Sequence, residues 1–156
     1  MRKHRAEKRT LEPDPRYGSP LVTRLIHAIM TEGKKTTAQR IVYGALDSLK
    51  ERTQEDNVMK VFNKAIENVR PRVELKPRRV GGATYQIPIE VLVPRGNSLA
   101  IRWLRDFSRK KKGKPMMQRL ADELLAAYKG EGPAIKKRDE THKMAEANKA
   151  FAHLRW

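Results

Sequence analysis

The amino-acid sequence predicts a mainly α-helical protein: a six-helix bundle with a basic N-terminal arm and an extended, basic, two-stranded β-hairpin between the third and fourth helices. Apolar residues recur at helical spacing in residues 17–69 and 93–156. Residues 70–92 instead alternate apolar and polar side chains, which is the period of a strand. Because 156 residues are about one domain's worth of chain, residues 1–156 are expected to form a single domain.

The first segment, residues 1–16, is basic and almost without apolar side chains, so we expect an arm that is disordered when alone. A helix follows, with its apolar residues on one face (Leu21, Leu25, Ile26, Ile29), and Gly33 is expected to end it. The second helix is expected to begin with Thr36 or Thr37 as its cap and to bury a stripe from Ala38 to Leu49. The third follows Asn57, presents Val58 to Val69 and ends before Pro71.

The hairpin is expected to turn at Gly81-Gly82. We expect its alternating apolar residues to share one face and its cations to occupy the other: Val73, Leu75, Tyr85, Ile87 and Ile89 against Arg72, Lys76 and Arg78. The two glycines could be present because the turn requires positive φ angles, or because their backbone cradles a phosphate. The role in the turn is favoured. A lone hairpin is marginal in water, so a basic one is best explained as an arm that orders against a polyanion.

The fourth helix is expected to start at a cap, Asn97 or Ser98, and to bury Trp103 with its neighbours. A basic loop, residues 109–115, then leads to a fifth helix that ends before Gly130. The sixth helix should run from Ala134 to about His153. Its apolar residues are mostly alanine, so we expect it on the outside, against RNA or another protein.

The charge balance points to a polyanionic partner. Thirty-five Lys and Arg face eighteen Asp and Glu, a net charge of +17 with a pI near 10.5. Nucleic acid is the leading candidate, because each neutralised phosphate releases counterions and adds to affinity. Cysteine is absent, which excludes disulfides and thiolate metal sites. No apolar run of about 18 residues and no signal-peptide core is present, so we predict a cytoplasmic protein without a membrane partner.

Motifs for catalysis, cofactors or metals are weak. Gly33-Lys34-Lys35 lacks the first glycine and the strand of a Walker loop. The four histidines never recur at metal-ligand spacing, and no triad is marked out. The adjacent acids Asp122-Glu123 and Asp139-Glu140 diverge around a helix and are interpreted as solvent or salt-bridge positions. We therefore predict no enzyme, no cofactor and no metal.

Two other functional classes stay open at this point. An architectural DNA-binding protein also suits a basic β-arm with a nearby proline. A nuclease or RNA-modifying enzyme is the other alternative, although no carboxylate cluster or cofactor loop supports it. Competition between duplex DNA and folded RNA would distinguish a DNA-binding protein from an RNA-binding one. Turnover of labelled RNA with added magnesium would reveal an enzyme.

Several segments match a known family in combination. They are LVTRLIHAIMTEGKKTTAQRIVYGA from Leu21, RRVGGATYQIPIEV from Arg78, Ser98-Leu99 with Arg102-Trp103-Leu104, and MAEANKAFAHLRW from Met144. Together they resemble the bacterial-type ribosomal protein seven of the small subunit, over nearly the whole chain. The departures are local: Thr84 for a common asparagine, Gly96-Asn97 in a usually more basic turn, and Leu154 for a common aromatic.

The resemblance implies a primary binder of small-subunit rRNA that nucleates assembly of the head, the three-prime major domain. It implies neighbouring small-subunit ribosomal proteins as partners, one of them at the C-terminal helix. The hairpin tip, Gly81, Gly82 and Ala83, would lie beside the exit-site tRNA and the mRNA path. Some members bind their own mRNA, which is left open here, and the ribosome could be cytoplasmic or organellar.

The expected RNA-binding residues lie in separated basic clusters, whose combination favours RNA more than any one cluster does. Trp156 could stack on a base or pack on the body, and both readings are kept. The full set is Arg2, Lys3, Arg5, Lys8, Arg9, Lys34, Lys35, Arg72, Lys76, Arg78, Arg79, Arg95, Arg102, Arg109, Lys110, Lys111, Lys112, Lys114, Lys136, Lys137, Arg138, Lys143, Arg155 and Trp156.

Overall fold

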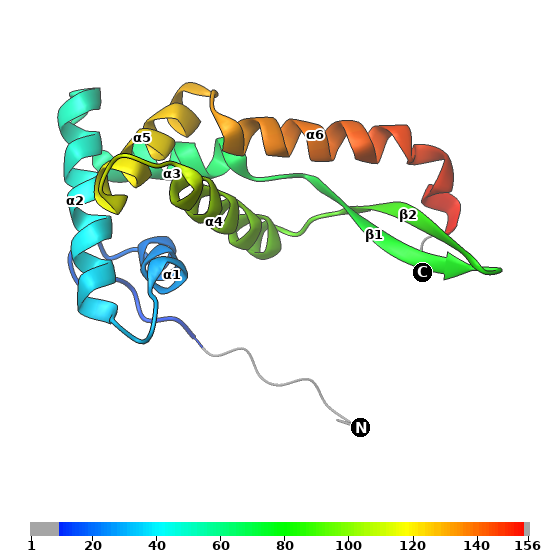
Figure 1. The fold of residues 1–156 in the computed structure, drawn as a ribbon, viewed down its shortest axis with the longest axis horizontal. Coiled ribbons are helices and arrows are strands. Elements are labelled where there is room, and N and C mark those ends of the chain that lie inside the picture. Colours follow the sequence, from blue (N-terminus) through cyan, green and yellow to red (C-terminus); the bar gives the residue numbers. More distant parts are fainter. Residues whose placement is uncertain (1–9, 155–156) are drawn as a thin grey trace.

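The computed structural model describes residues 10–154, and it is mainly helical with one β-hairpin between the third and fourth helices (Figure 1), as predicted. The elements in this range are α1 (Pro20–Ile29), α2 (Lys35–Thr53), α3 (Val58–Val69), β1 (Val73–Val80), β2 (Ala83–Glu90), α4 (Val93–Lys110), α5 (Met116–Lys129), α6 (Pro133–Ala147) and the 3₁₀-helix η1 (Lys149–Leu154).

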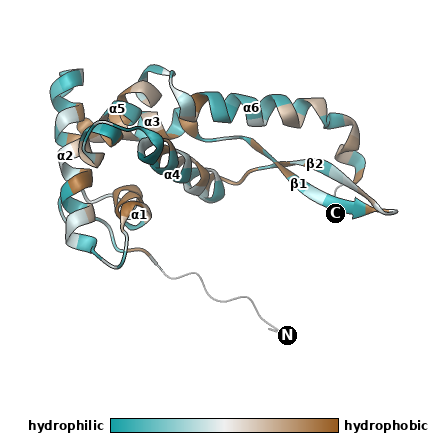
Figure 2. Ribbon diagram, viewed as in Figure 1, coloured by the Kyte–Doolittle hydropathy of each residue, from teal (hydrophilic) through white to brown (hydrophobic). Residues whose placement is uncertain are grey.

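The hydrophobic core lies among α1 to α5. Helix α5 packs against α2, α3 and α4, and α1 packs against α2 and α4. Fully buried side chains from each helix meet there: Leu25, Leu46, Phe62, Leu104 and Leu124. Trp103, expected in the core, is partly buried and packs against it. In Figure 2 the apolar colouring gathers inside this body, whereas α6 is mostly hydrophilic along its length.

The helix boundaries reveal a side-chain cap on α3 and correct two expectations, for α1 and α2. Asn57 caps α3, because its Oδ1 accepts from the backbone N–H groups of Met59 and Lys60. Helix α1, however, ends at Ile29, before an extended Met30, and not at Gly33. Helix α2 begins at Lys35, so neither Thr36 nor Thr37 caps it.

Helix α4 begins at Val93, earlier than predicted. Pro94 lies in its first turn, where a missing N–H costs nothing and the fixed φ favours the helix. Ser98 is therefore inside the helix, and its hydroxyl donates to the carbonyl of Pro94 at 2.9 Å. Gly96 is also helical, and a Cβ there would lie 2.7 Å from Cγ of Arg70. The glycine thus leaves room for the Arg70 stem.

The hairpin turns at Gly81-Gly82 as predicted, both with positive φ, but its faces differ from the prediction. Lys76 pairs with Ile87 and Arg78 pairs with Tyr85, and paired residues of an antiparallel ribbon share a face. Because the turn has two residues, each odd-numbered residue of one strand pairs with an even-numbered residue of the other. The apolar residues of β1 and β2 therefore lie on opposite faces, and the expected single apolar face is wrong.

The C-terminal segment packs on the hairpin, which the sequence did not lead us to expect. Helix α6 ends at Ala147, not near His153, and η1 continues the chain along β2. The Tyr85 ring lies 5.1 Å from the Phe151 ring, centroid to centroid, and Ile87 on the same face is fully buried. Most of α6 is outside the core as predicted, except that Ala134 and Ile135 in its first turn belong to the core.

Candidate RNA interface

A groove between α1 and α4 gathers basic side chains from two distant parts of the sequence. Arg24 and His27 line it from α1, and Arg102 and Arg105 line it from α4, around a cavity of about 320 Å³. Only Arg102 was expected among the RNA-binding residues. We call this surface the α1/α4 groove. Its concentration of guanidinium groups suits phosphate, because the planar fork of arginine matches phosphate oxygens.

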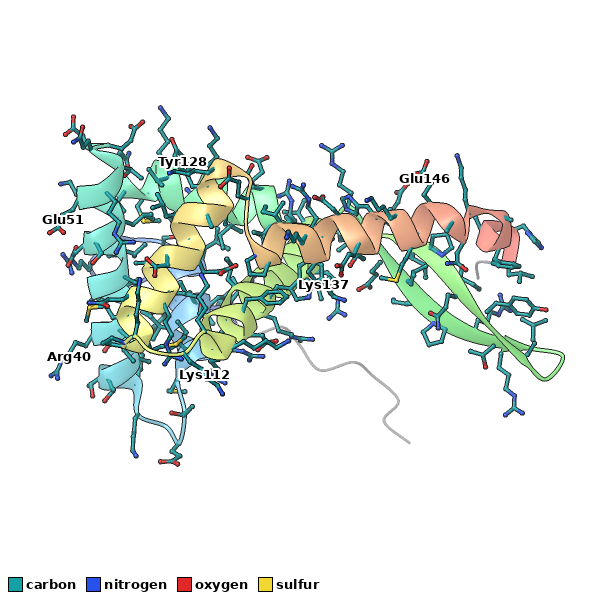
Figure 3. All side chains as sticks on the ribbon, turned by 45° about the horizontal axis from the view of Figure 1, so that its top comes forward. Arg40, Glu51, Lys112, Tyr128, Lys137 and Glu146 are labelled. Atoms are coloured by element: carbon teal, nitrogen blue, oxygen red, sulfur yellow. The ribbon has the colours of Figure 1, made fainter. Side chains whose placement is uncertain are left out.

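The basic segment 109–115 was expected to be a loop, but Arg109 and Lys110 form the last turn of α4 and only residues 111–115 link α4 to α5. Several of its cations hold this segment to the body. Arg109 donates to the carbonyl of Ile29 at 3.2 Å, at the end of α1. Lys111 forms an ion pair with Glu123 at 2.7 Å, and Lys114 one with Asp122 at 3.0 Å. Lys110 and Lys112 are exposed, and Figure 3 labels Lys112. The loop thus combines anchoring cations with others that face solvent.

Glu123 is the largest departure from the sequence interpretation of the acids. It is fully buried, not solvated, although the salt-bridge part of the interpretation is correct. Its Oε1 also accepts from the backbone N–H of Ala134 at 3.3 Å, so it links α5 to the start of α6. Asp122 is paired with Arg52 and Lys114. The hydrogen bond from Arg52 is the main cause that lowers the pKa of Asp122. Burial opposes it, and the hydrogen bond from Lys114 lowers the pKa further.

Arg119 of α5 organises the same loop and was missed by sequence reasoning. Its guanidinium donates to the carbonyl oxygens of Arg109 and Lys111. These bonds fix the backbone between two residues of the predicted RNA-binding set. Nothing in the periodicity of α5 marks Arg119 as different from any other cation on a helix.

The start of the described chain is anchored by a polar cluster. Asp14 is 3 % exposed, accepts from the backbone N–H groups of Arg16 and Tyr17, and accepts from the Tyr43 hydroxyl at 2.8 Å. Burial, followed by that hydrogen bond, raises the pKa of Tyr43. The Arg16 guanidinium lies 5.2 Å from both tyrosine ring centroids and pairs with Asp47 at 2.8 Å. This arrangement fixes where the chain enters the body.

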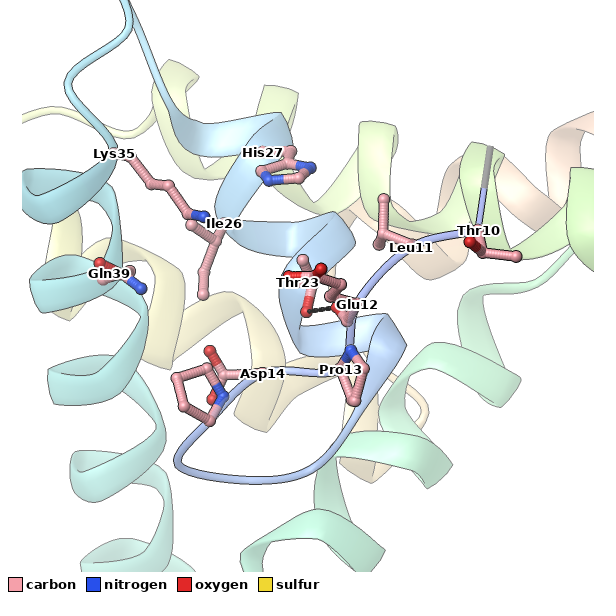
Figure 4. A pocket seen from close by; sticks show the side chains of 11 residues that line it. Thr10, Leu11, Glu12, Pro13, Asp14, Thr23, Ile26, His27, Lys35 and Gln39 are labelled. Carbon is pink, nitrogen blue, oxygen red and sulfur yellow. Dashed lines mark hydrogen bonds between the residues drawn. The ribbon is translucent and has the colours of Figure 1, made fainter. Parts of the chain in front are cut away.

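A pocket lies beside this anchor, between residues 10–15 and helices α1 and α2 (Figure 4). Its lining includes Lys35 and His27, and the Thr23 hydroxyl donates to the carbonyl of Glu12 at 2.9 Å across it. Lys34, the other cation predicted in this turn, is exposed and pairs with Glu32 at 2.7 Å. Lys35 therefore lines the pocket, whereas its neighbour Lys34 lies in solvent beside Glu32.

The cations of the hairpin do not form one surface. Arg72, Lys76 and Arg78 share the face of Tyr85 and Ile87, on which η1 packs, whereas Arg79 lies on the opposite face. Lys76 and Arg95 meet at Glu74, with 3.8 and 3.3 Å between charged atoms. Arg78 donates to the carbonyl of Leu154.

The cations of α6 are similarly divided. Arg138 is held between Asp139 and the carbonyl of Asn68, while Lys136 and Lys143 are exposed and Lys137 is partly buried. The remaining predicted contacts lie outside the described residues: Arg2, Lys3, Arg5, Lys8, Arg9, Arg155 and Trp156. Sequence reasoning also missed Arg24, Arg105 and His27, because only the packing of α1 on α4 brings them beside Arg102.

Within the described part of the chain, no group of three or more His, Asp or Glu side chains could hold a metal ion. No helix in that range is long and apolar enough to cross a membrane. The concave features are lined by cations and sit on a helical body with a projecting ribbon. Fold and site together define a basic, helical protein with a projecting hairpin, whose cation-lined concavities suit a polyanionic ligand.

The chain belongs to the ribosomal protein S7p/S5e family, whose model matches residues 1–149. It is similar to the small ribosomal subunit protein uS7 of Fervidobacterium nodosum, with 60% identity over 156 residues that cover all of both chains. The uS7 proteins of Thermotoga neapolitana and Thermotoga maritima are each 58% identical over the full length of both chains. The predicted family is thereby confirmed.

Proposed function

We propose that this protein is a structural, non-enzymatic component of the small ribosomal subunit that binds rRNA and neighbouring ribosomal proteins. Family membership carries the assignment to the ribosome and to its cytoplasmic location. The α1/α4 groove is the structural observation that supports RNA binding, because it joins four basic or titratable side chains from two helices. RNA would be recognised there through phosphate position and shape.

The finer role is that of a primary binder in the head, or three-prime major, domain of small-subunit rRNA, which nucleates assembly of the head. Exposed cations from the groove, the α4–α5 loop and the hairpin would contact different strands of one folded junction. Arg102, Arg79, Lys112 and, in the last turn of α4, Lys110 are among the exposed members of the predicted set in these places. Such a spread of contacts suits a protein that holds several helices of RNA together.

The hairpin tip, residues 81–83, would lie beside the exit-site tRNA and the mRNA path. The tip is exposed and both of its glycines adopt turn conformations, which supports a close approach of backbone to a neighbour and not a phosphate cradle. A photoreactive residue in place of Ala83 should crosslink to tRNA in assembled ribosomes with an occupied exit site. Crosslinks to rRNA alone would contradict this placement. Binding to its own mRNA is a further proposal, tested by adding that mRNA as a competitor.

The main test is footprinting on small-subunit rRNA, combined with the salt dependence of affinity. Replacing Arg24 and Arg102 with Gln should weaken protection of a head-domain fragment and make the salt slope shallower by roughly one to two. Replacing Lys34, Lys35, Arg78 and Arg79 with Ala should act in the same direction. Lys60→Gln, an exposed cation on α3, is the matched control. Equal slopes in all variants would contradict the proposed interface, and preference for duplex DNA would favour an architectural DNA-binding protein.

A further inference from the structure

A second basic concavity lies away from the α1/α4 groove, where the end of α3, the link to β1 and α6 meet. We call it the elbow pocket. It has a volume of about 420 Å³ and is lined by Glu67, Asn68, Arg70, Arg72, Arg138 and His142. Figure 1 shows α1 and α6 on opposite sides of α4. The elbow pocket is therefore a separate site and not an extension of the groove.

Three guanidinium groups and one carboxylate line the elbow pocket. The carboxylate, Glu67, is 70 % exposed and lies 3.7 Å from Arg70, a long contact for an ion pair. Within the described residues, no carboxylate lies within ion-pair distance of Arg72. The positive charge that faces the pocket is thus only partly balanced by the protein, and a bound anion would offset it.

Two of the three arginines, Arg138 and Arg70, are held in place before any ligand arrives. Arg138 donates to the carbonyl of Asn68 and pairs with the adjacent Asp139. The Arg70 stem lies against Gly96, where any larger residue would displace it. Arginine binds phosphate through a planar fork, and prior fixation reduces the side-chain entropy lost on binding.

His142 reports on the charge inside the pocket. Its Nε2 accepts from the backbone N–H of Arg72 at 3.0 Å, so this nitrogen carries no proton and the imidazole is neutral. Burial, followed by the charge of Arg138, lowers the pKa of His142; Asp139 raises it and Arg72 lowers it further. An anion among these guanidiniums would favour the imidazolium, and would therefore raise that pKa.

We propose that the elbow pocket binds one phosphate group of an RNA backbone, as a second anion site separate from the α1/α4 groove. The proposal rests on the proposed RNA-binding function only for the source of the phosphate. The arginines of the pocket suit a phosphate group from any source. Arg70 and Arg72 would contact the oxygens, and Arg138 would supply fixed charge. An acidic protein segment is the competing occupant that the test must exclude.

The test follows the imidazole C–H signals of the full chain by NMR as pH is varied, with His142→Gln to assign the signal. Dimethyl phosphate is the main probe, because its single charge matches a backbone phosphodiester and does not titrate near neutral pH. Chloride at equal ionic strength is the reference. Dimethyl phosphate should raise the apparent pKa of His142 saturably in the wild type and in Lys60→Gln. The effect should be lost in Arg70→Gln/Arg72→Gln.

Two results would overturn the proposal. One is an equal response of the double variant and the wild type, which would indicate general screening. The other is a response to polyglutamate and none to dimethyl phosphate, which would indicate an acidic protein partner. Circular dichroism of the double variant controls for folding, and Arg72→Gln alone, at an exposed position, repeats the measurement if the double variant unfolds.

The source of the phosphate is resolved by two further arms. A head-domain rRNA fragment that shifts the His142 signal in the wild type, and not in the double variant, identifies RNA as the source. A response to inorganic phosphate with none to RNA identifies free phosphate instead, and would overturn the RNA assignment while leaving the anion site. Failure of the proposed function looks different, because the fragment would then not bind the wild type at all.

Discussion

The ring of Tyr85 on β2 packs against the ring of Phe151 in η1, with 5.1 Å between centroids and 51° between planes. This contact joins the outer part of the hairpin to the last described helix, across 66 positions of sequence. Together with the bond from Arg72 to His142, it fastens the ribbon along α6 at both ends. The hairpin therefore has an intramolecular support from α6 and η1, in addition to any that RNA supplies.

Removing the aromatic contact should loosen the hairpin and spare the body. Phe151→Ala is expected to increase amide hydrogen exchange in residues 83–90, because an aromatic pair contributes about 0.5–1.5 kcal/mol beyond its buried area. Exchange in α2 and α3 should not change. Leu92→Ala, at a residue that is 79% exposed, is the control. Unchanged exchange in β2 would show that Phe151 does not support the ribbon.

Breaking the ion pair between Lys111 and Glu123 should destabilise the whole fold. Lys111→Met leaves the fully buried Glu123 carboxylate without its cation, which is expected to cost about 1–3 kcal/mol. Urea denaturation followed by circular dichroism measures the loss. Lys112→Met, the exposed neighbour, should change the free energy of unfolding by less than about 0.5 kcal/mol. A similar loss in both variants would mean that the charge of the loop matters and the buried pair does not.

The pairing of Asp122 with Arg52 and Lys114 predicts an acid-sensitive contribution to stability. The folded pKa of Asp122 is lowered, so the contribution is fully present above its unfolded pKa of about 3.8 and is lost as pH falls through the folded value. The free energy of unfolding of the wild type should therefore exceed that of Asp122→Asn at neutral pH. The difference should shrink below about pH 4. A difference that does not depend on pH would assign the effect to packing.

The anchor of the N-terminal arm depends on a buried carboxylate. Asp14→Ala would leave the Tyr43 hydroxyl and two backbone N–H groups without their acceptor, at a cost of about 1–3 kcal/mol. Limited proteolysis should then cleave residues 10–17 faster than in the wild type, while α3 and α5 stay protected. Glu12→Ala, at an exposed neighbour, should cleave at the wild-type rate. Equal rates in all three proteins would contradict an anchoring role.

Local patterns in the sequence were enough for the elements and the family. The stripe from Val58 to Val69, with Asn57 before it, predicts α3 closely, because both features depend on contacts within one or two helical turns. Gly81-Gly82 likewise predicts the turn. Its two-residue length also dictates that Arg78 pairs with Tyr85, so the mistaken single apolar face came from ignoring the register. The helix starts at Lys35 and Val93 were missed because neither begins with a side-chain cap.

What the sequence by itself determined is the helical body, the basic ribbon and the excess of positive charge; these follow from periodicity, turn residues and composition. Only the tertiary structure decided which cations lie together. Arg24 joins Arg102, Arg72 joins Arg138, and Glu123 is buried beneath Lys111. Such pairings depend on how helices cross and where loops return, and residues 12 to 78 positions apart carry no local signal of that geometry. The grouping of these charges into two separate basic concavities is therefore a property of packing.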